Sequence, residues 1–363
     1  ASINAFGLDL LARLTAGPAA NVVFSPTSIG IALAMTAVGA RGLTLEEMKR
    51  VLHADAAAPF DRSMNAMGAA LEGRSRTDER GAVTLEIANS LWGQRGTGFE
   101  PPFLDTLATE YGAGLQLVDY RADAEGARTK INAWVDEATN ERIPELLAPG
   151  VLNADSRLTL VNAVYLKANW AEVFDAQRTA PAPFQLADGT TVDVPMMHLQ
   201  RHFGYAEGDG WQAVELPYVF GELAMTVVVG DGDLDGAINA LADHEVILSF
   251  PKFDIETSTS LAEVLGALGM PTAFTDSADF TGMTTDEPLH ISDVIHQANI
   301  TVDEEGTEAA AATAVVMTAG AAPAPGEPVT MVVDRPFTFA LRDVPTGAVV
   351  FLGRVGDPSQ GRS

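Results

Sequence analysis

A segment that is apolar on both of its alternating faces constrains the fold of this chain most. Residues 158–166 read Leu-Thr-Leu-Val-Asn-Ala-Val-Tyr-Leu, and only Thr159 and Asn162 interrupt the apolar pattern. A β-strand points successive side chains to opposite faces of its sheet, so both faces of this strand must be covered. The chain therefore needs a sheet with layers on either side, and its 363 residues are long enough to build them.

The sequence before residue 158 has mainly helical patterns. Ser25-Pro26 predicts the start of a helix, with Ser25 as N-cap, and an apolar run follows it as far as Val38. Thr44 and Glu47 predict a capping box that begins the next helix.

Strand patterns dominate after residue 158. Residues 223–229 and 246–250 are expected strands, and residues 336–355 predict a terminal hairpin that turns at 343–347. Between them, Ser260 and Glu263 predict a second capping box. Because no repeat or change of composition divides the chain, we interpret residues 1–363 as a single α+β domain.

The charge balance excludes several classes of partner. Forty-nine acidic residues against 22 basic ones give a net charge of −27, which repels phosphate backbones, heparin-like polyanions and anionic lipid. The arginine-containing run 72–80 also holds acidic residues, and we interpret it as a solvated loop. We therefore expect no nucleic-acid, heparin-like or membrane partner.

The location of the protein is left open by its sequence. No run of 18 or more apolar residues predicts a membrane span. The first residues lack the basic start and apolar run of a secretory signal, and an extracellular location is favoured over a cytoplasmic one.

Patterns for catalysis or for metal binding are weak. The chain has no cysteine, which excludes thiol catalysis and disulfides. His198 and His202 lie four residues apart, but the nearby Pro195 argues against a helical metal pair. Residues 231–236 resemble the start of a calcium loop, whose twelfth position is here Ala242 instead of glutamate. We expect no enzyme activity, no metal and no cofactor.

The segment 309–326 is unusual because 18 consecutive residues carry no charge. It could be a flexible linker, or a helix built on residues 309–314. Strand-like sequence lies on both sides of it, however, and no second domain follows. We therefore interpret it as a long loop of one domain.

The same segment also has the pattern of a strand. Its alternation would place one set of small, apolar or hydroxyl-bearing side chains on a buried face: Thr307, Ala309, Ala311, Thr313, Val315 and Met317. Glu308 would face solvent, and Gly306 could absorb a sharp change of backbone direction. The segment is thus suited to be a loop in one state and an inner strand in another.

Residues 303–313, Asp-Glu-Glu-Gly-Thr-Glu-Ala-Ala-Ala-Ala-Thr, resemble the hinge of an inhibitory serpin. Other segments resemble the same family in the same order along the chain: 21–29, 160–170, 295–298 and 334–339. The resemblance therefore extends from about residue 21 to residue 355. Only four of the 22 basic residues are lysine, which is typical of a bacterial chain from a GC-rich genome.

The resemblance implies three β-sheets, about nine helices and an exposed reactive-centre loop at about residues 304–328. In this family a serine protease attacks the loop and forms an acyl-enzyme, and the cleaved loop inserts into the large sheet as an extra strand. The fold must start metastable, and one monomeric inhibitor is consumed per protease. Fourteen residues, 307–320, would span about 46 Å at ~3.3 Å each.

The resemblance also implies roles for single residues. The hinge comprises Glu304, Gly306, Thr307, Glu308, Ala309, Ala310, Ala311 and Ala312. A shutter beneath the opening strands comprises Ser25, Ser28, Asn162 and His296. Trp170 corresponds to the breach at the top of the sheet.

The sequence leaves five candidate residues for the position of the cleaved bond. A family count of sixteen residues beyond Glu304 gives Gly320-Ala321, while Met317, Thr318 and Ala319 offer better side chains for a protease pocket. No Arg or Lys lies between Glu304 and Glu327, so chymotrypsin-, subtilisin- or elastase-like targets are expected rather than trypsin-like ones. The alternative is a non-inhibitory serpin with a chaperone, carrier or storage role.

Overall fold

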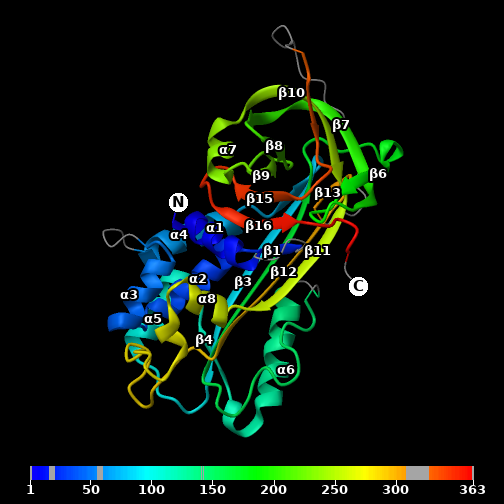
Figure 1. The fold of residues 1–363 in the computed structure, drawn as a ribbon. Coiled ribbons are helices and arrows are strands. Elements are labelled where there is room, and N and C mark those ends of the chain that lie inside the picture. The colour runs from blue at the N-terminus through cyan, green and yellow to red at the C-terminus, as the bar shows by residue number, and fades with distance from the viewer. Residues whose placement is uncertain are drawn as a thin grey trace.

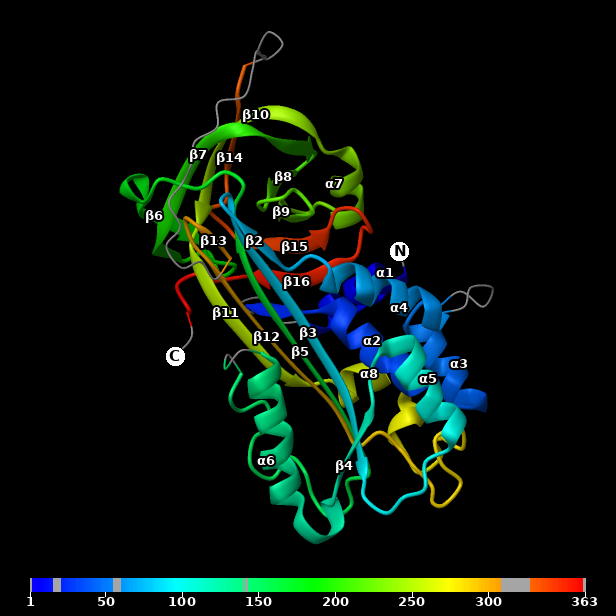
Figure 2. The same ribbon diagram turned by 180° about the vertical axis from the view of Figure 1, so that it is seen from behind.

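Helices lie on both sides of a long sheet in the computed structural model, which describes residues 2–15, 21–54, 60–139, 141, 143–307 and 327–361 (Figure 1). One group of helices lies against one face of this sheet, and α6 lies alone on the other face (Figures 1 and 2). The described residues form eight α-helices, against about nine expected: α1 Ser2–Leu14, α2 Pro26–Ala37, α3 Gly42–Val51, α4 Phe60–Glu72, α5 Pro101–Tyr111, α6 Tyr120–Ala138, α7 Leu234–Ala240 and α8 Ala262–Leu268.

The long sheet has seven strands. Their spatial order is β11 Phe253–Ser260, β12 Asp293–Val302, β13 Gly306–Thr307, β5 Leu158–Asn169, β3 Gly81–Gln94 and β2 Arg76–Asp78, with β4 Leu115–Val118 also paired to β3. β5 is central and antiparallel to β3, whereas it runs parallel to β12.

The second sheet has nine hydrogen-bonded strands. Their order is β1 Val22–Phe24, β16 Val349–Val355, β15 Phe337–Asp343, β9 Leu223–Gly230, β8 Trp211–Pro217, β7 Thr191–Gly208, β10 Ala242–Pro251 and β14 Val329–Val332, with β6 Ala180–Gln185 paired to β7. The 18-residue β7 pairs with β6 and β10 along most of its length, and its last residues pair with β8. It thereby joins what would otherwise be two sheets, so the expected three sheets form two hydrogen-bonded networks.

The central strand is buried on both faces, as its sequence predicts. Residues 158–166 of β5 are all buried. Leu158 and Leu160 pack in the core beneath the helices, and Val161 and Ala163 pack on the face that α6 covers. The predicted terminal hairpin is also present, as β15 and β16.

The N-cap prediction is confirmed at Ser25 and is wrong at Thr44. Ser25 Oγ accepts the Ser28 N–H at 3.1 Å, and α2 begins at Pro26. α3 begins at Gly42, so Thr44 and Glu47 lie inside the helix. Their side chains are buried against a neighbouring segment, where Thr44 Oγ1 accepts the Asp279 N–H and Glu47 Oε2 accepts the Thr272 N–H.

The second capping box is also wrong, for a similar reason. The N-cap position of α8 is Leu261, and Ser260 is the last residue of β11. Ser260 donates its hydroxyl to Asp293 on the paired strand β12 instead. In both cases a tertiary partner is available to the side chain and replaces the local hydrogen bond that the pattern predicts.

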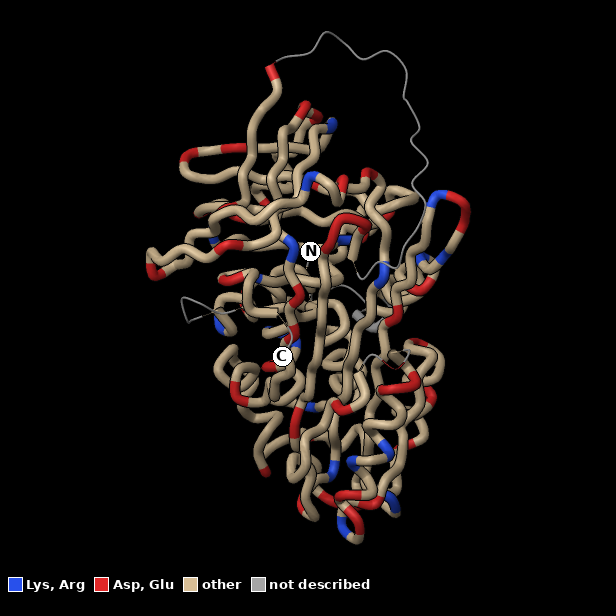
Figure 3. The backbone as a smooth tube through the Cα atoms, turned by 90° about the vertical axis from the view of Figure 1, so that its right-hand side faces the viewer, with Lys and Arg blue, Asp and Glu red and all other residues tan. Residues whose placement is uncertain are grey.

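The run 72–80 is exposed at every position except the partly buried Arg74, as predicted, but it contains the strand β2 instead of being a loop throughout. β2 pairs with the start of β3. The Arg74 side chain is only 15% exposed and lies 2.6 Å from the buried carboxylate of Asp343. Charge elsewhere is spread along the whole molecule, with acidic residues predominating (Figure 3). Within the described residues, no helix is long and apolar enough to cross a membrane.

Candidate functional site

The boundary between β5 and β12, here called the seam, is closed at one end and occupied at the other. The two strands pair directly through six residue pairs, from Thr159 opposite Asp293 to Val164 opposite Ala298. Beyond these pairs the short strand β13 lies between them, with Thr307 opposite Ala168 on β5 and Val302 on β12. The chain that leads into residues 308–326 therefore already occupies the upper seam.

A glycine allows the chain to enter the seam at this point. Gly306 has φ +153°, and a Cβ there would lie 2.0 Å from the Ala168 carbonyl oxygen. The preceding turn is held by Asp303, whose Oδ1 accepts the N–H groups of Glu305 and Gly306 at 2.9 and 3.2 Å. Any larger residue at position 306 must push β13 away from β5.

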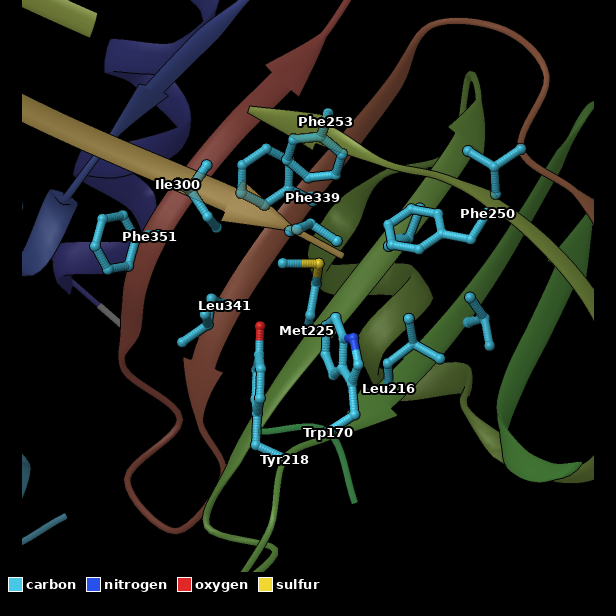
Figure 4. Packing of buried hydrophobic residues seen from close by; sticks show 14 of the residues in the cluster. Trp170, Leu216, Tyr218, Met225, Phe250, Phe253, Ile300, Phe339, Leu341 and Phe351 are labelled. Atoms are coloured by element: carbon cyan, nitrogen blue, oxygen red, sulfur yellow. The ribbon is translucent and has the colours of Figure 1, made fainter. Parts of the chain in front are cut away.

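Thr307 is buried, with 1% of its surface exposed. Its hydroxyl lies 2.6 Å from the hydroxyl of Tyr218, and burial raises the pKa of Tyr218, which keeps that phenol protonated. Tyr218 stacks on Trp170 with ring centroids 4.4 Å apart (Figure 4). Trp170 in turn donates its indole N–H to the Asp303 carbonyl at 3.0 Å, so both rings hold the chain around Thr307.

Glu304 anchors the same turn to the nine-stranded sheet. Its carboxylate accepts from Lys252 Nζ at 2.6 Å and from Thr179 Oγ1 at 2.8 Å. Partial burial opposes ionisation, but these hydrogen bonds outweigh it and lower the pKa of Glu304 below its usual range. The carboxylate is therefore charged at neutral pH and fixes the position of the turn.

A buried histidine and asparagine face each other across the lower seam. Ser25 donates its backbone N–H to His296 Nε2 at 3.0 Å, so the ring proton resides on Nδ1, which donates to Asn162 Oδ1. Both side chains are fully buried. Burial lowers the pKa of His296 to about 3, and the ring is neutral at physiological pH.

Asn89 extends this pair into a row across three strands, and the sequence patterns missed it. Asn89 on β3 is the register partner of Asn162, which is in turn the partner of His296 on β12. Ser28 donates its hydroxyl to Asn89 Oδ1 at 2.8 Å. The only sequence signal was a polar residue inside an otherwise strand-like segment.

Several predicted residues lie outside the described residues. Among them are the hinge positions Glu308, Ala309, Ala310, Ala311 and Ala312 and the candidate cleavage positions Met317, Thr318, Ala319, Gly320 and Ala321. The other predicted positions gather at two levels of the seam. Glu304, Gly306, Thr307 and Trp170 surround its upper end, and Ser25, Ser28, Asn162 and His296 surround its lower part.

The residues that the sequence offered as weak metal-binding candidates, His198, His202 and the turn 231–236, make other contacts in the structure. His198 lies 3.0 Å from the Ser249 hydroxyl, and His202 lies 3.1 Å from the Asp243 carboxylate. Asp233 caps the N-terminus of α7 by accepting the Gly236 N–H. No cluster of three or more metal-binding side chains occurs in the part of the chain that the structure describes.

Comparison with known proteins gives one consistent result. The family model described as serpin (serine protease inhibitor) matches residues 1–358. An uncharacterised serpin-like protein of Thermococcus kodakarensis is 38% identical over 99% of this chain and 86% of its own length. Leukocyte elastase inhibitor A of Rattus norvegicus is 37% identical over 97% of both chains.

Solved structures agree with this result. The native state of the thermophilic serpin tengpin superposes with a TM-score of 0.84 at 28% identity, over 98% of this chain and 93% of that one. Thyroxine-binding globulin, solved in complex with thyroxine, gives a TM-score of 0.85 at 26% identity over 99% of both chains. This chain therefore belongs to the serpin family of serine protease inhibitors.

Proposed function

We propose that this chain is a monomeric, irreversible suicide-substrate inhibitor of serine proteases. The observation that carries the proposal is the occupied upper seam: β13 lies between β5 and β12 directly above the six pairs that hold these strands together. A strand that continued from Thr307 would separate those pairs one after another. Cleavage of the loop would release its N-terminal part to do so, because that part would no longer be tethered at both ends.

The register of β13 supports this continuation in detail. Six residues beyond Thr307, the same antiparallel register brings Thr313 opposite Asn162 on β5 and opposite His296 on β12. The inserted strand would thus replace the contact between these two side chains with a threonine that can donate and accept hydrogen bonds. Ala309 and Ala311 would enter above it, where small side chains meet an already packed core.

The length of the insertion is set by β5. In that register residues 307–317 pair with β5 from Ala168 down to Leu158, which spans about 33 Å at ~3.3 Å per residue. A protease attached at the end of this segment would be carried along the sheet by that distance. The new strand forms two rows of backbone hydrogen bonds, one on each side, and replaces the single row between β5 and β12, so the net gain of about one row contributes to the driving force.

The chemistry of trapping belongs to the protease. Its serine oxygen attacks the carbonyl carbon of the cleaved bond, that carbon–nitrogen bond breaks, and the serine proton passes through the protease histidine to the departing amine. The resulting ester would normally be hydrolysed. Insertion that outpaces hydrolysis leaves the ester intact, so one inhibitor inactivates one protease.

The target class follows from the residues that the loop offers. Met317, Thr318, Ala319, Gly320 and Ala321 supply small or apolar side chains and no cation. Such residues suit chymotrypsin-, subtilisin- or elastase-like pockets. The likeness to leukocyte elastase inhibitors over nearly the whole chain supports the same class.

A carrier role is the second candidate, because thyroxine-binding globulin was solved with thyroxine bound and shares this fold at 26% identity. The two functions differ in what a protease does to the loop. The intact protein should be incubated with chymotrypsin, subtilisin and elastase and then analysed by denaturing gel and intact mass. The proposal predicts an SDS-stable adduct and a released peptide whose mass identifies the cleaved bond. Clean loop cleavage without an adduct by all three proteases would reject the inhibitor and favour the carrier.

A further inference from the structure

Arg354 is a partly buried residue of β16 whose charge is not balanced nearby. Its guanidinium makes no ion pair and no hydrogen bond with any residue that the structure describes. Four other arginines, with side chains that are 13–19% exposed, each pair with a carboxylate: Arg74, Arg128, Arg157 and Arg342. A cation that is withdrawn from water without a partner is unfavourable, so the site of Arg354 is suited to an anion from outside the chain.

The helix α1 lies along β16 and places Leu11 level with Arg354 (Figure 1). The Asn4 side chain accepts a backbone N–H at the start of β16, and a Cβ on Gly7 would lie 3.4 Å from the Leu352 side chain. Four further residues of helix advance by ~6 Å, and two further residues of strand advance by ~6.6 Å. Leu11 therefore lies over Arg354, and the helix ends one turn later.

A cavity of about 390 Å³ opens where α1 ends, and both Leu11 and Arg354 line it. The turn after β6 and the start of β15 supply further walls, including Leu186 and Pro336. The backbone of Arg354 pairs with β1 on one side and with β15 on the other, so it is the side chain of this residue that reaches the cavity. The volume is in the range of small-molecule sites, about 300–1,000 Å³.

Thr338 adds a hydroxyl beside the guanidinium. Thr338 on β15 and Arg354 on β16 are register partners, so their side chains lie next to each other on the same face of the sheet. Thr338 also lines the cavity, and its hydroxyl makes no hydrogen bond with the described residues. The two side chains can therefore donate to the same acceptor, and a carboxylate is the acceptor that fits the fork of a guanidinium.

The other charged residues of the cavity limit the charge of the ligand. Arg335 lines the cavity, but its side chain is 57% exposed and lies 2.9 Å from the Asp334 carboxylate. Asp231 lines the cavity as well and would repel a second negative charge. Among the described lining residues, Arg354 is thus the one unpaired cation, which favours a monoanion over a polyanion.

We propose that this cavity binds a small organic molecule with one carboxylate and an apolar body. The carboxylate accepts two parallel hydrogen bonds from Arg354 and a third from the Thr338 hydroxyl. The apolar body lies against Leu11, Leu186 and Pro336. None of the described residues that line the cavity belongs to the seam, so this binding does not depend on the proposed inhibition.

The test compares two probes that have the same rings and differ in charge. 2-Naphthoate and its neutral counterpart 2-naphthamide are each added to the intact protein, and binding is measured by equilibrium dialysis. 2-Naphthoate should bind saturably with a Kd of about 1 mM or tighter. 2-Naphthamide should bind about tenfold to a hundredfold more weakly, the range given by loss of a hydrogen bond to a charged group.

Variants of the cavity identify the site of binding. Arg354→Gln should weaken 2-naphthoate binding by about tenfold or more and remove the preference over the amide. The matched control is Arg50→Gln, which removes an exposed arginine that does not line the cavity and should bind as the parent does. Thr338→Val removes only the hydroxyl and should weaken binding about twofold to tenfold, so it decides the matter if Arg354→Gln does not fold.

Three results would overturn the proposal: no saturable binding of 2-naphthoate by the parent protein, equal affinity for the two probes, or parent affinity in the cavity variants. Failure of the proposed function has a different signature. A protein that fails as an inhibitor forms no SDS-stable adduct with any protease, whatever its affinity for 2-naphthoate.

Discussion

Replacement of Thr307 by arginine should convert the inhibitor into a substrate. Thr307 is buried in the upper seam and its hydroxyl contacts Tyr218 at 2.6 Å. A guanidinium is much larger than the threonine side chain that fills this buried position, so Thr307→Arg must leave the seam and take β13 with it. Insertion of the cleaved loop would then require burial of a charge at its first step.

The magnitude follows from two contributions. Loss of the Tyr218 hydroxyl's partner costs about 1–3 kcal/mol, because that buried phenol is left without its hydrogen bond. Burial of the guanidinium during insertion adds several kcal/mol, on the order of 3 or more. Since ~1.4 kcal/mol changes a rate tenfold, insertion should slow by roughly 100-fold or more, while hydrolysis of the acyl-enzyme is unchanged.

The assay is the stoichiometry of inhibition, titrated against chymotrypsin, subtilisin or elastase. Thr307→Arg should be cleaved with almost no adduct. The matched control is Glu308→Arg, which carries the same side chain at the next position, predicted by the alternation to face solvent after insertion, and it should inhibit within about twofold of the parent stoichiometry, because its charge would stay in water. Stoichiometric inhibition by Thr307→Arg would refute the assignment of Thr307 to the buried face of the inserting strand.

Two further variants examine the upper and the lower seam. Gly306→Ala should lower the thermal unfolding midpoint, because its Cβ would lie 2.0 Å from the Ala168 carbonyl oxygen. The control is Gly210→Ala, which has φ +78° but no atom within 4 Å of its Cβ and therefore carries only the backbone strain. Equal midpoints for the two variants would argue against a tight fit of β13. Burial lowers the pKa of His296 to about 3 from its ordinary 6.5, so the unfolded chain binds this proton first as the pH falls. The contribution of neutral His296 to the free energy of unfolding should therefore be full above pH 6.5 and should decrease toward pH 3 by about 1.4 kcal/mol per pH unit. Denaturant unfolding at pH 7 and at pH 5.5 should show a smaller loss of stability in His296→Gln than in the parent protein. Equal losses would contradict a buried neutral histidine.

The sequence predicted the features that depend on local pattern. The doubly buried strand 158–166, the N-cap at Ser25 and the terminal hairpin all depend on alternation or on residue type over a few positions, and all three are present. The family resemblance added the positions of Asn162 and His296, and the structure brings them into contact across the seam.

The sequence failed where a distant partner determines the role of a side chain. Thr44, Glu47 and Ser260 matched capping patterns, yet each hydrogen-bonds to another segment because folding brings a stronger partner close. The run 72–80 is solvated as predicted, but its charges balance in sequence and gave no sign of a long-range ion pair. Arg74 instead pairs with Asp343, 269 residues away, which no local pattern can indicate.

The seam pairing of β13 could not be derived from pattern either. The alternation of residues 307–318 predicted which face of a strand would be buried, but a strand was only one of the states open to that segment. Gly306 and Thr307 lie in the seam because three residues bind the chain there. Ala168 pairs with its backbone, Trp170 donates its indole N–H to the Asp303 carbonyl, and Tyr218 contacts the Thr307 hydroxyl. These three residues come from two different sheets.

A disulfide across the seam would test the central claim most directly. Val164 and Ala298 are the uppermost direct pair of β5 and β12, both are fully buried, and the parent chain has no cysteine to compete. Because a buried cysteine packs as a small apolar residue, Val164→Cys/Ala298→Cys should fold in either redox state. The measurement is the stoichiometry of inhibition of one preparation, oxidised and then reduced, with the disulfide verified by intact mass. We predict that the oxidised protein is cleaved as a plain substrate and that reduction restores the SDS-stable adduct; adduct formation at the parent stoichiometry by the oxidised protein would contradict trapping by strand insertion.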